Sequence, residues 1–92
     1  MIPGVFSNDF TNVFNELLQK SGASCYKISK YAQIDEPYIY RLSKGEKKNP
    51  SPEIIIRIYF ALTHLNNNIT LDDLDELLKS IGHTIFPRNN SK

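Results

Sequence analysis

The sequence has a single cysteine and only two histidines among its 92 residues. One cysteine, Cys25, cannot form an internal disulfide, which excludes the disulfide-stabilised class of small secreted domains. His64 and His83 are distant in sequence from Cys25 and from each other, so the spacing typical of a zinc site is missing. We therefore expect no structural zinc, no other metal and no cofactor.

Long hydrophobic runs are missing too. No run approaches the roughly 18 consecutive apolar residues that a membrane-spanning helix needs, and residues 1–6 lack the basic start and apolar stretch of a secretory signal. We expect a cytoplasmic protein that has no membrane partner. With 40% hydrophobic and 23% charged residues, the chain suits one domain with one core. We place this domain at residues 1–88 and expect a disordered tail at residues 89–92.

Recognisable catalytic motifs are also absent. Serine, cysteine and histidine residues occur, but none lies in a nucleophile elbow, and no glycine-rich phosphate loop follows a strand-like segment. The acidic residues between Asp72 and Glu76 lie at the spacing of a helix surface, beside a stripe of leucines. The sequence therefore predicts that the protein is not an enzyme.

The formal net charge is only +1, but the charges are unevenly distributed. Residues 20–48 contain seven basic and three acidic side chains, which gives a local charge of +4. Residues 72–79 contain one basic and four acidic side chains, which gives a local charge of −3. One region is therefore expected to attract phosphate groups and the other to repel them.

Apolar residues recur at helical spacing along nearly the whole chain, which predicts an all-α fold with five helices. Residue types that cap helix N-termini, and glycines that end helices, set the expected limits. Thr70 and Asp73 fit a capping box in its acidic form. The expected helices run from Ser7 or Asp9 to Gly22, from Ser24 to Ala32, from Asp35 to Gly45, from Ser51 to Asn66 and from Thr70 to Gly82.

The second and third of these helices are short, and only Gln33 and Ile34 separate them in a tight turn. Short helices joined in this way are typical of a helix-turn-helix. Because Ile39 and Leu42 anchor one side of the third helix, its other side is free to meet a polar partner. The residues expected to face the core of the whole domain are Phe6, Phe10, Val13, Phe14, Leu17, Leu18, Ile28, Tyr31, Ala32, Ile39, Leu42, Ile55, Ile58, Tyr59, Leu62, Leu71, Leu74, Leu77 and Leu78.

The register of these residues resembles that of the Cro and phage-repressor domains, often called the Xre family of transcriptional regulators. The resemblance covers residues 10–62. It implies a compact, five-helix, lambda-repressor-like DNA-binding domain in which the second and third helices form the helix-turn-helix. It also implies a sequence-specific regulator of transcription, a repressor that acts by occupying its operator. The matching positions are Ile28, Ile34, Asp35, Ile39, Leu42, Gly45, Pro50, Ser51 and Leu62.

Four positions depart from the family pattern. Cys25 replaces a glutamine that usually contacts phosphate and supports the recognition helix, so that contact is expected to be lost. Ser29 replaces a small residue, usually alanine, and still permits close approach of the two helices. Gln33 replaces the glycine of the turn, which costs about 1–2 kcal/mol if Gln33 is left-handed. Ser43 replaces a frequent glutamate and removes a common internal ion pair.

The resemblance also implies that the first turns of the third helix enter the major groove of double-stranded DNA. Arg41 suits bidentate pairing with guanine, and Glu36 can accept a hydrogen bond from cytosine. Flexible lysines suit phosphate anchoring, and four of them would give log K a slope of about −3.6 against log salt concentration. The expected base contacts are Glu36, Pro37, Tyr38 and Arg41, and the expected phosphate contacts are Lys27, Tyr40, Lys44, Lys47 and Lys48.

Each of these residues also has a purely structural interpretation. Glu36 suits the helix dipole of a first turn equally well. Arg41 and the lysines are also explained as a solvated surface. One of the two tyrosines, Tyr38 or Tyr40, is expected to cover the edge of the core instead of contacting DNA.

Relatives of this kind usually act as symmetric pairs, because one small domain buries too little DNA surface for tight specific binding. The chain has apolar residues to spare, which predicts a homodimer formed through the fifth helix and the segment after it. Such a dimer would present two recognition helices about 34–36 Å apart to a palindromic operator. The alternative is that these residues complete the core against residues 2–6. The expected interface residues are Phe60, Ile81, Ile85 and Phe86.

A second class of function stays open. The same fold can serve as a protein-interaction module, such as an antitoxin-like subunit, that uses Tyr38, Tyr40 and the apolar patches to bind a protein partner. Site-dependent and salt-sensitive binding of DNA separates the two classes.

Overall fold

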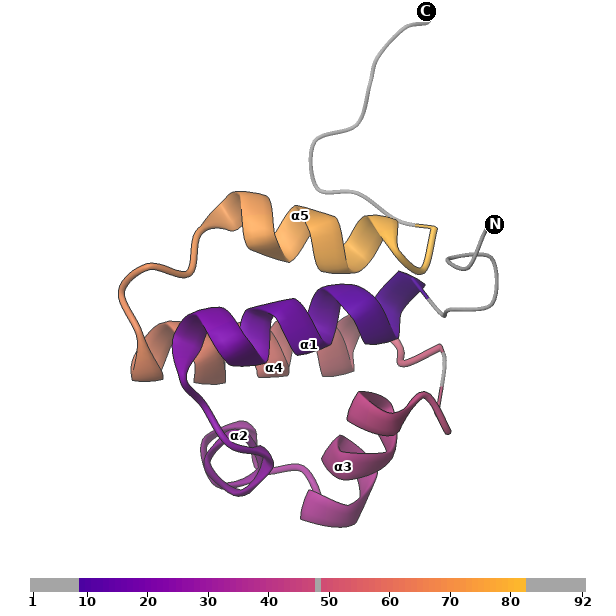
Figure 1. Cartoon of the computed structure of the whole chain (residues 1–92), viewed down its shortest axis with the longest axis horizontal. Coiled ribbons are helices and arrows are strands. Elements are labelled where there is room, and N and C mark those ends of the chain that lie inside the picture. Colours follow the sequence, from indigo (N-terminus) through magenta and orange to yellow (C-terminus); the bar gives the residue numbers. More distant parts are fainter. Residues whose placement is uncertain (1–8, 48, 83–92) are drawn as a thin grey trace, which may run out of the picture.

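The structure is a computed structural model that describes residues 9–47 and 49–82. All regular secondary structure in these residues is α-helical, so the prediction of an all-α fold with five helices is confirmed. In chain order the helices are α1 (Asp9–Ser21), α2 (Cys25–Ala32), α3 (Glu36–Lys44), α4 (Pro52–Leu65) and α5 (Leu71–Lys79), as Figure 1 shows.

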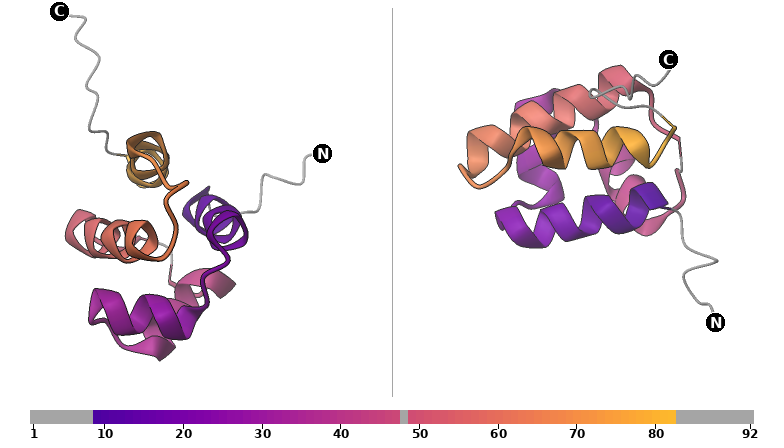
Figure 2. Two further views of the ribbon diagram at one scale, coloured as in Figure 1. Left: turned by 90° about the vertical axis from the view of Figure 1, so that its left-hand side faces the viewer. Right: turned by 90° about the horizontal axis from the view of Figure 1, so that it is seen from above.

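The helices pack in three levels. Helices α1 and α4 form the middle of the molecule, α5 lies against both of them on one side, and α2 and α3 lie on the other side (Figures 1 and 2). Helix α2 packs against α4, and α3 packs against α1 and α2. The basic part of the chain and the acidic helix α5 therefore occupy opposite ends of the molecule (Figure 1).

One hydrophobic core runs through all three levels. Phe10 and Phe14 of α1 are fully buried and their rings stack with centroids 5.5 Å apart. Every described residue that was expected to face the core is buried or packs against the buried set, apart from Tyr31 and Leu71. The core residues are Phe10, Phe14, Leu17, Ile28, Ala32, Ile39, Leu42, Ile55, Ile58, Tyr59, Ala61, Leu62, Ile69, Leu74, Leu77 and Leu78.

Three sequence-based expectations about burial were wrong. Tyr31 is 45% exposed. Its ring lies against the His64 ring of α4, and the two ring centroids are 4.3 Å apart. Leu71 is 54% exposed, and Ile69 fills the core at that end of α5 instead. Asp75, which was expected on the surface of α5, is buried and pairs with Lys79 through an Oδ2–Nζ distance of 3.1 Å. Phe6 lies outside the described residues.

The predicted N-caps Ser24, Ser51 and Thr70 are confirmed, whereas α5 ends at Lys79 with Ser80 as its C-cap, before the predicted stop at Gly82. The side chains of Ser24 and Ser51 accept hydrogen bonds from the backbone N–H groups of Lys27 and Ile54, at 3.1 and 3.3 Å. Asp35 occupies the N-cap position of α3 but makes no side-chain capping hydrogen bond. The missing bond costs less here because Pro37, in the first turn of α3, has no N–H group that a cap would need to satisfy.

Gln33, the residue in the place of the family's turn glycine, ends α2 in the left-handed conformation, at φ 58° and ψ 49°. A side chain with a Cβ atom is disfavoured there by about 1–2 kcal/mol. We expect Gln33→Gly to raise the free energy of unfolding by up to about 1 kcal/mol, because the extra freedom of glycine in the unfolded chain offsets part of the gain. Thermal unfolding measures the change, with Gln33→Ala as the control that keeps the Cβ atom. A melting temperature lowered by glycine would contradict this account.

Asp73 joins the N-terminus of α5 to α1. Its carboxylate completes the predicted capping box with Thr70 and accepts a hydrogen bond from the Lys20 ammonium group at 2.8 Å. Burial alone would raise the pKa of the Asp73 carboxyl, but the hydrogen bonds from Lys20 and from Thr70 outweigh burial and lower it below its ordinary value. The ionised form is therefore favoured by folding.

A pKa that is lower in the folded than in the unfolded state contributes stability above the unfolded-state value and loses it as the pH falls through the folded-state value. We expect Asp73→Asn to lower the free energy of unfolding by about 1 kcal/mol at neutral pH, the usual value of a cap. The difference between the two proteins should shrink as the pH falls below the ordinary range of aspartate. Urea unfolding over a series of pH values measures it, with Glu76→Gln, at an exposed position of the same helix, as the control. A difference that is constant with pH would contradict the assignment.

Candidate nucleic-acid interface

The turn between α2 and α3 sets the direction of α3. The backbone N–H groups of Gln33 and Ile34 both donate to the carbonyl oxygen of Ser29, and the bond from Ile34 is 3.2 Å long. The Ile34 side chain is half-buried and packs against the core. These contacts hold the start of α3 close to the end of α2, so the two helices form one unit at the end of the molecule opposite α5 (Figure 1).

Helix α3 has one buried side and one exposed side. Ile39 and Leu42 are 0% exposed, which confirms that they face the interior. Pro37 and four polar residues that project from the rest of the helix are exposed: Glu36, Tyr40, Arg41 and Lys44. The helix is therefore anchored on its apolar side and presents a row of polar side chains to solvent.

The two tyrosines of α3 differ in their surroundings. Tyr38 packs against the core, and burial raises the pKa of its phenol. Tyr40 is 51% exposed and lies beside Lys44, whose Nζ atom is 5.3 Å from the ring centroid. The expectation that one tyrosine covers the edge of the core is confirmed for Tyr38, and only part of its side chain is left on the surface.

Helix α1 holds the far end of α3 in place. The Asn15 side-chain amide donates to the carbonyl oxygen of Ser43 at 2.9 Å and to that of Thr11 at 3.0 Å. The Thr11 hydroxyl donates to the carbonyl oxygen of Leu42 at 3.4 Å. Sequence reasoning missed these two positioning residues. Their only signal is that Thr11 and Asn15 are four residues apart, on a polar strip of α1 next to its apolar stripe.

Gly45 then turns the chain away from α3. It is left-handed, at φ 81°, as predicted, and its N–H group is satisfied by the carbonyl oxygens of Arg41 and Leu42. The backbone N–H groups of Glu46 and Lys47 also donate to the carbonyl oxygen of Arg41, at 2.9 and 3.3 Å. The basic loop after α3 is thus folded back onto the last turn of the helix, beside its exposed side.

Three lysines and Arg41 on this surface make no ion pair with another described residue. Lys27 of α2, Lys44 of α3 and Lys47 of the following loop are exposed. None of the three ion pairs in the part of the chain that the structure describes involves these lysines or Arg41. Their charges are therefore available to an external anion. Lys48, the fourth predicted phosphate contact, lies outside the described residues.

Of the predicted dimer residues, the structure describes Phe60 and Ile81, and these two differ in exposure. Phe60 is 62% exposed on the outer side of α4. Ile81 packs against the core and is only partly exposed, so the expectation of a spare apolar residue is wrong there. It continues the buried leucine stripe of α5 past the end of that helix. Ile85 and Phe86 lie outside the described residues.

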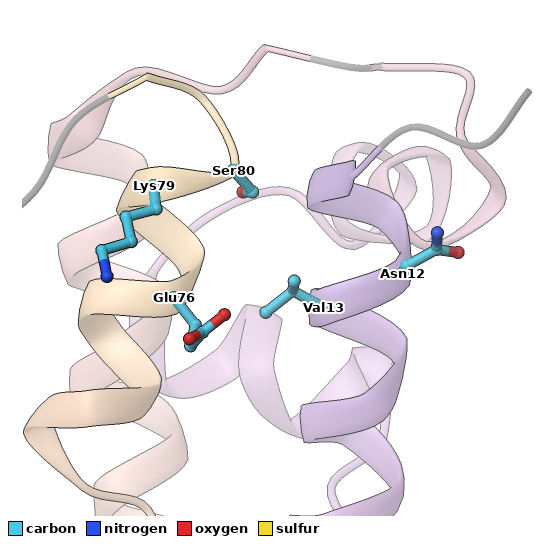
Figure 3. Close-up of a pocket in the computed structure, with 5 residues that line it drawn as sticks. All are labelled: Asn12, Val13, Glu76, Lys79 and Ser80. Carbon is cyan, nitrogen blue, oxygen red and sulfur yellow. The ribbon is translucent and has the colours of Figure 1, made fainter. Parts of the chain in front are cut away.

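A shallow hollow lies at the opposite end of the molecule from α3. It has a volume of about 240 Å³, lies between α1 and α5 and is lined by Asn12, Val13, Glu76, Lys79 and Ser80 (Figure 3). The Ser80 hydroxyl in it already donates to the carbonyl oxygen of Leu77. Within residues 9–47 and 49–82 no three His, Cys, Asp or Glu side chains gather as metal ligands, and no helix has the length and apolar character to cross a bilayer.

Comparison of the chain with protein-family models, with curated proteins and with solved structures gave no match. The family resemblance therefore rests on the register of residues 10–62 alone.

Proposed function

We propose that the protein is a sequence-specific DNA-binding regulator of transcription, a repressor of the Cro and phage-repressor type that acts by occupying its operator. In this proposal α2 and α3 form the helix-turn-helix, and α3 is the recognition helix. One observation carries the proposal. Ile39 and Leu42 are fully buried while Arg41, between them in sequence, is exposed with no internal ion pair in the described residues.

The side chains of α3 then have separate roles. Arg41 has a planar fork of donors that matches O6 and N7 of guanine, and Glu36 accepts from N4 of cytosine. Pro37 and the exposed edge of Tyr38 offer apolar contact to a thymine methyl group. These side chains project from the first two turns of the helix, the part that reaches base edges in this mode of docking.

The surrounding groups fix the position of the domain on the duplex without reading sequence. Lys27, Lys44 and Lys47 neutralise phosphates on either side of the groove, and the Tyr40 hydroxyl donates to a further phosphate. The acidic residues Asp72 and Glu76 of α5 are exposed at the far end of the molecule. Their charges repel a duplex that approaches from the wrong side, so the field of the protein favours the productive orientation.

Selection from a pool of random duplexes tests the proposal directly. We expect an enriched motif whose halves repeat after about one helical turn, since two copies acting together require a palindromic site. Titration of the selected duplex at about 50 and 200 mM salt should give, for each bound copy, a slope of log K against log salt concentration near −2.7 for the three described lysines and near −3.6 if Lys48 also takes part. A pool that shows no enrichment would contradict the proposal.

The second candidate is a protein-interaction module, such as an antitoxin-like subunit. The exposure of Phe60 on the outer side of α4 favours this candidate, because a large aromatic side chain in water commonly marks a contact surface. The same titration separates the two functions. A protein-interaction module would bind selected and unrelated duplexes equally and weakly, and Arg41→Ala would not change that binding.

A further inference from the structure

The outer side of α4 carries an unpaired apolar surface. Ile56 and Phe60, four residues apart on α4, are both exposed, and Phe60 borders a hollow between α4 and α2. The Tyr31 ring of α2 continues the surface through its contact with His64. Large apolar side chains gathered in this way on a small domain usually belong to an interface.

A hollow of about 240 Å³ opens in this surface between α2 and α4. It is lined by Tyr31, Ala32, Gln33, Arg57 and Phe60. Its walls are mainly apolar, and Arg57 places a positive charge at its edge. The Arg57 guanidinium is 3.6 Å from the Glu53 carboxylate, but both side chains are exposed, so this pair is weak and can be exchanged. The hollow therefore suits an apolar side chain that is followed by an acid.

The same chain carries such a pair of residues. Leu71 is 54% exposed at the first position of α5, and Asp72, which is also exposed, follows it. Both residues lie just after the loop that leaves α4, at the end of the molecule where α4 has its C-terminus (Figure 1). Leu71 and Asp72 do not line the hollow of their own copy, so both side chains are open to a second molecule.

We infer that a second copy of this chain occupies the hollow. In a two-fold dimer each copy inserts Leu71 between Tyr31 and Phe60 of the other copy and pairs Asp72 with the other copy's Arg57. Two-fold symmetry makes each contact twice, which is how a small surface gains affinity. This inference builds on the proposed function, in which two copies occupy one operator, but its test requires no DNA. It places the interface on α2, α4 and the start of α5, not on the segment after α5.

The oligomeric state of the full chain gives the first test. Sedimentation equilibrium should show a dimer for the natural protein, and Phe60→Ser and Leu71→Ser should each weaken it at least tenfold. Both residues are exposed in the single copy, so circular dichroism should show that both variants keep their helices. Glu76→Arg is the matched control on α5, because Glu76 faces α1 and not the proposed interface (Figure 3). A natural protein that is monomeric at high micromolar concentration would overturn the inference.

Charge reversal gives the sharper test. Arg57→Asp alone and Asp72→Arg alone should each be largely monomeric, because each of the two contacts between residue 57 and residue 72 then joins side chains of the same charge. An equimolar mixture of the two variants should dimerise again, since both pairs across the interface become opposite in charge. A mixture that stays monomeric, while the natural protein dimerises, would overturn the interface. Enrichment of a single half-site by a monomeric protein would overturn only this inference and leave the proposed function standing.

Discussion

Changing Arg41 to alanine should weaken binding to the selected duplex by about 5- to 150-fold, the range that corresponds to 1–3 kcal/mol for one bidentate pair with guanine. Binding to unrelated duplex should change far less, because Arg41 is assigned to a base and not to a phosphate. The variant should keep its stability, since Arg41 is exposed and has no ion pair in the described residues. Competition titrations with both duplexes measure the two affinities.

Lys44→Ala is the matched control, because Lys44 lies one turn further along the same exposed side of α3. As a phosphate contact it should weaken binding to both duplexes alike and reduce the salt slope by about 1. Arg41→Ala should instead weaken binding mainly to the selected duplex. If Arg41→Ala behaved like Lys44→Ala, Arg41 would be one more phosphate contact. If neither variant changed binding, α3 would not be the recognition helix.

Local interactions explain why most helix limits could be predicted from the sequence. Ser24, Ser51 and Thr70 each cap the helix that follows through a hydrogen bond to a residue three positions away. Gly45 ends α3 because glycine accepts the left-handed conformation without strain. Such contacts depend only on neighbours in the chain. The burial of Ile39 and Leu42 followed in the same way from helical periodicity.

The remaining features depend on contacts between residues far apart in the chain. Asn15 reaches a carbonyl oxygen 28 residues away, and no local pattern distinguishes it from a solvated asparagine. Tyr31 has the spacing of a core residue, but its ring lies at the surface, where it is tilted against the His64 ring of α4. The burial of Asp75 likewise reflects how α5 packs in the fold. Amphipathic side chains and long-range polar contacts therefore account for the wrong and missed assignments.

The exposed side of α3 was predictable because its geometry follows from two buried anchors. Tyr38 and Tyr40 are two residues apart and chemically identical, yet only Tyr38 packs against the core. Tyr38 is four residues before Leu42 and therefore lies on the buried side of the helix, whereas Tyr40 lies on the opposite side. The periodicity of α3 thus contained this choice, although the sequence analysis left it open.

Truncating one of the two anchors should have the largest effect on stability. Ile39→Ala removes a fully buried side chain at the base of α3 and leaves a cavity, which should lower the free energy of unfolding by about 2–5 kcal/mol. A domain of this size has only about 5–14 kcal/mol in total, at roughly 0.05–0.15 kcal/mol per residue. Urea unfolding followed by circular dichroism measures the change.

Tyr40→Ala, the change at the adjacent residue, is the control, and it should alter the free energy of unfolding by no more than about 0.5 kcal/mol because Tyr40 is exposed. The two variants should also differ in DNA binding. Ile39→Ala should weaken binding to every duplex, since α3 loses its anchor, and added glycerol or lower temperature should partly restore it. Tyr40→Ala should produce the modest, uniform loss of a single phosphate contact. Equal stability of the two variants would mean that α3 is not held by its apolar side, and the assignment of its exposed side to DNA would fail with it.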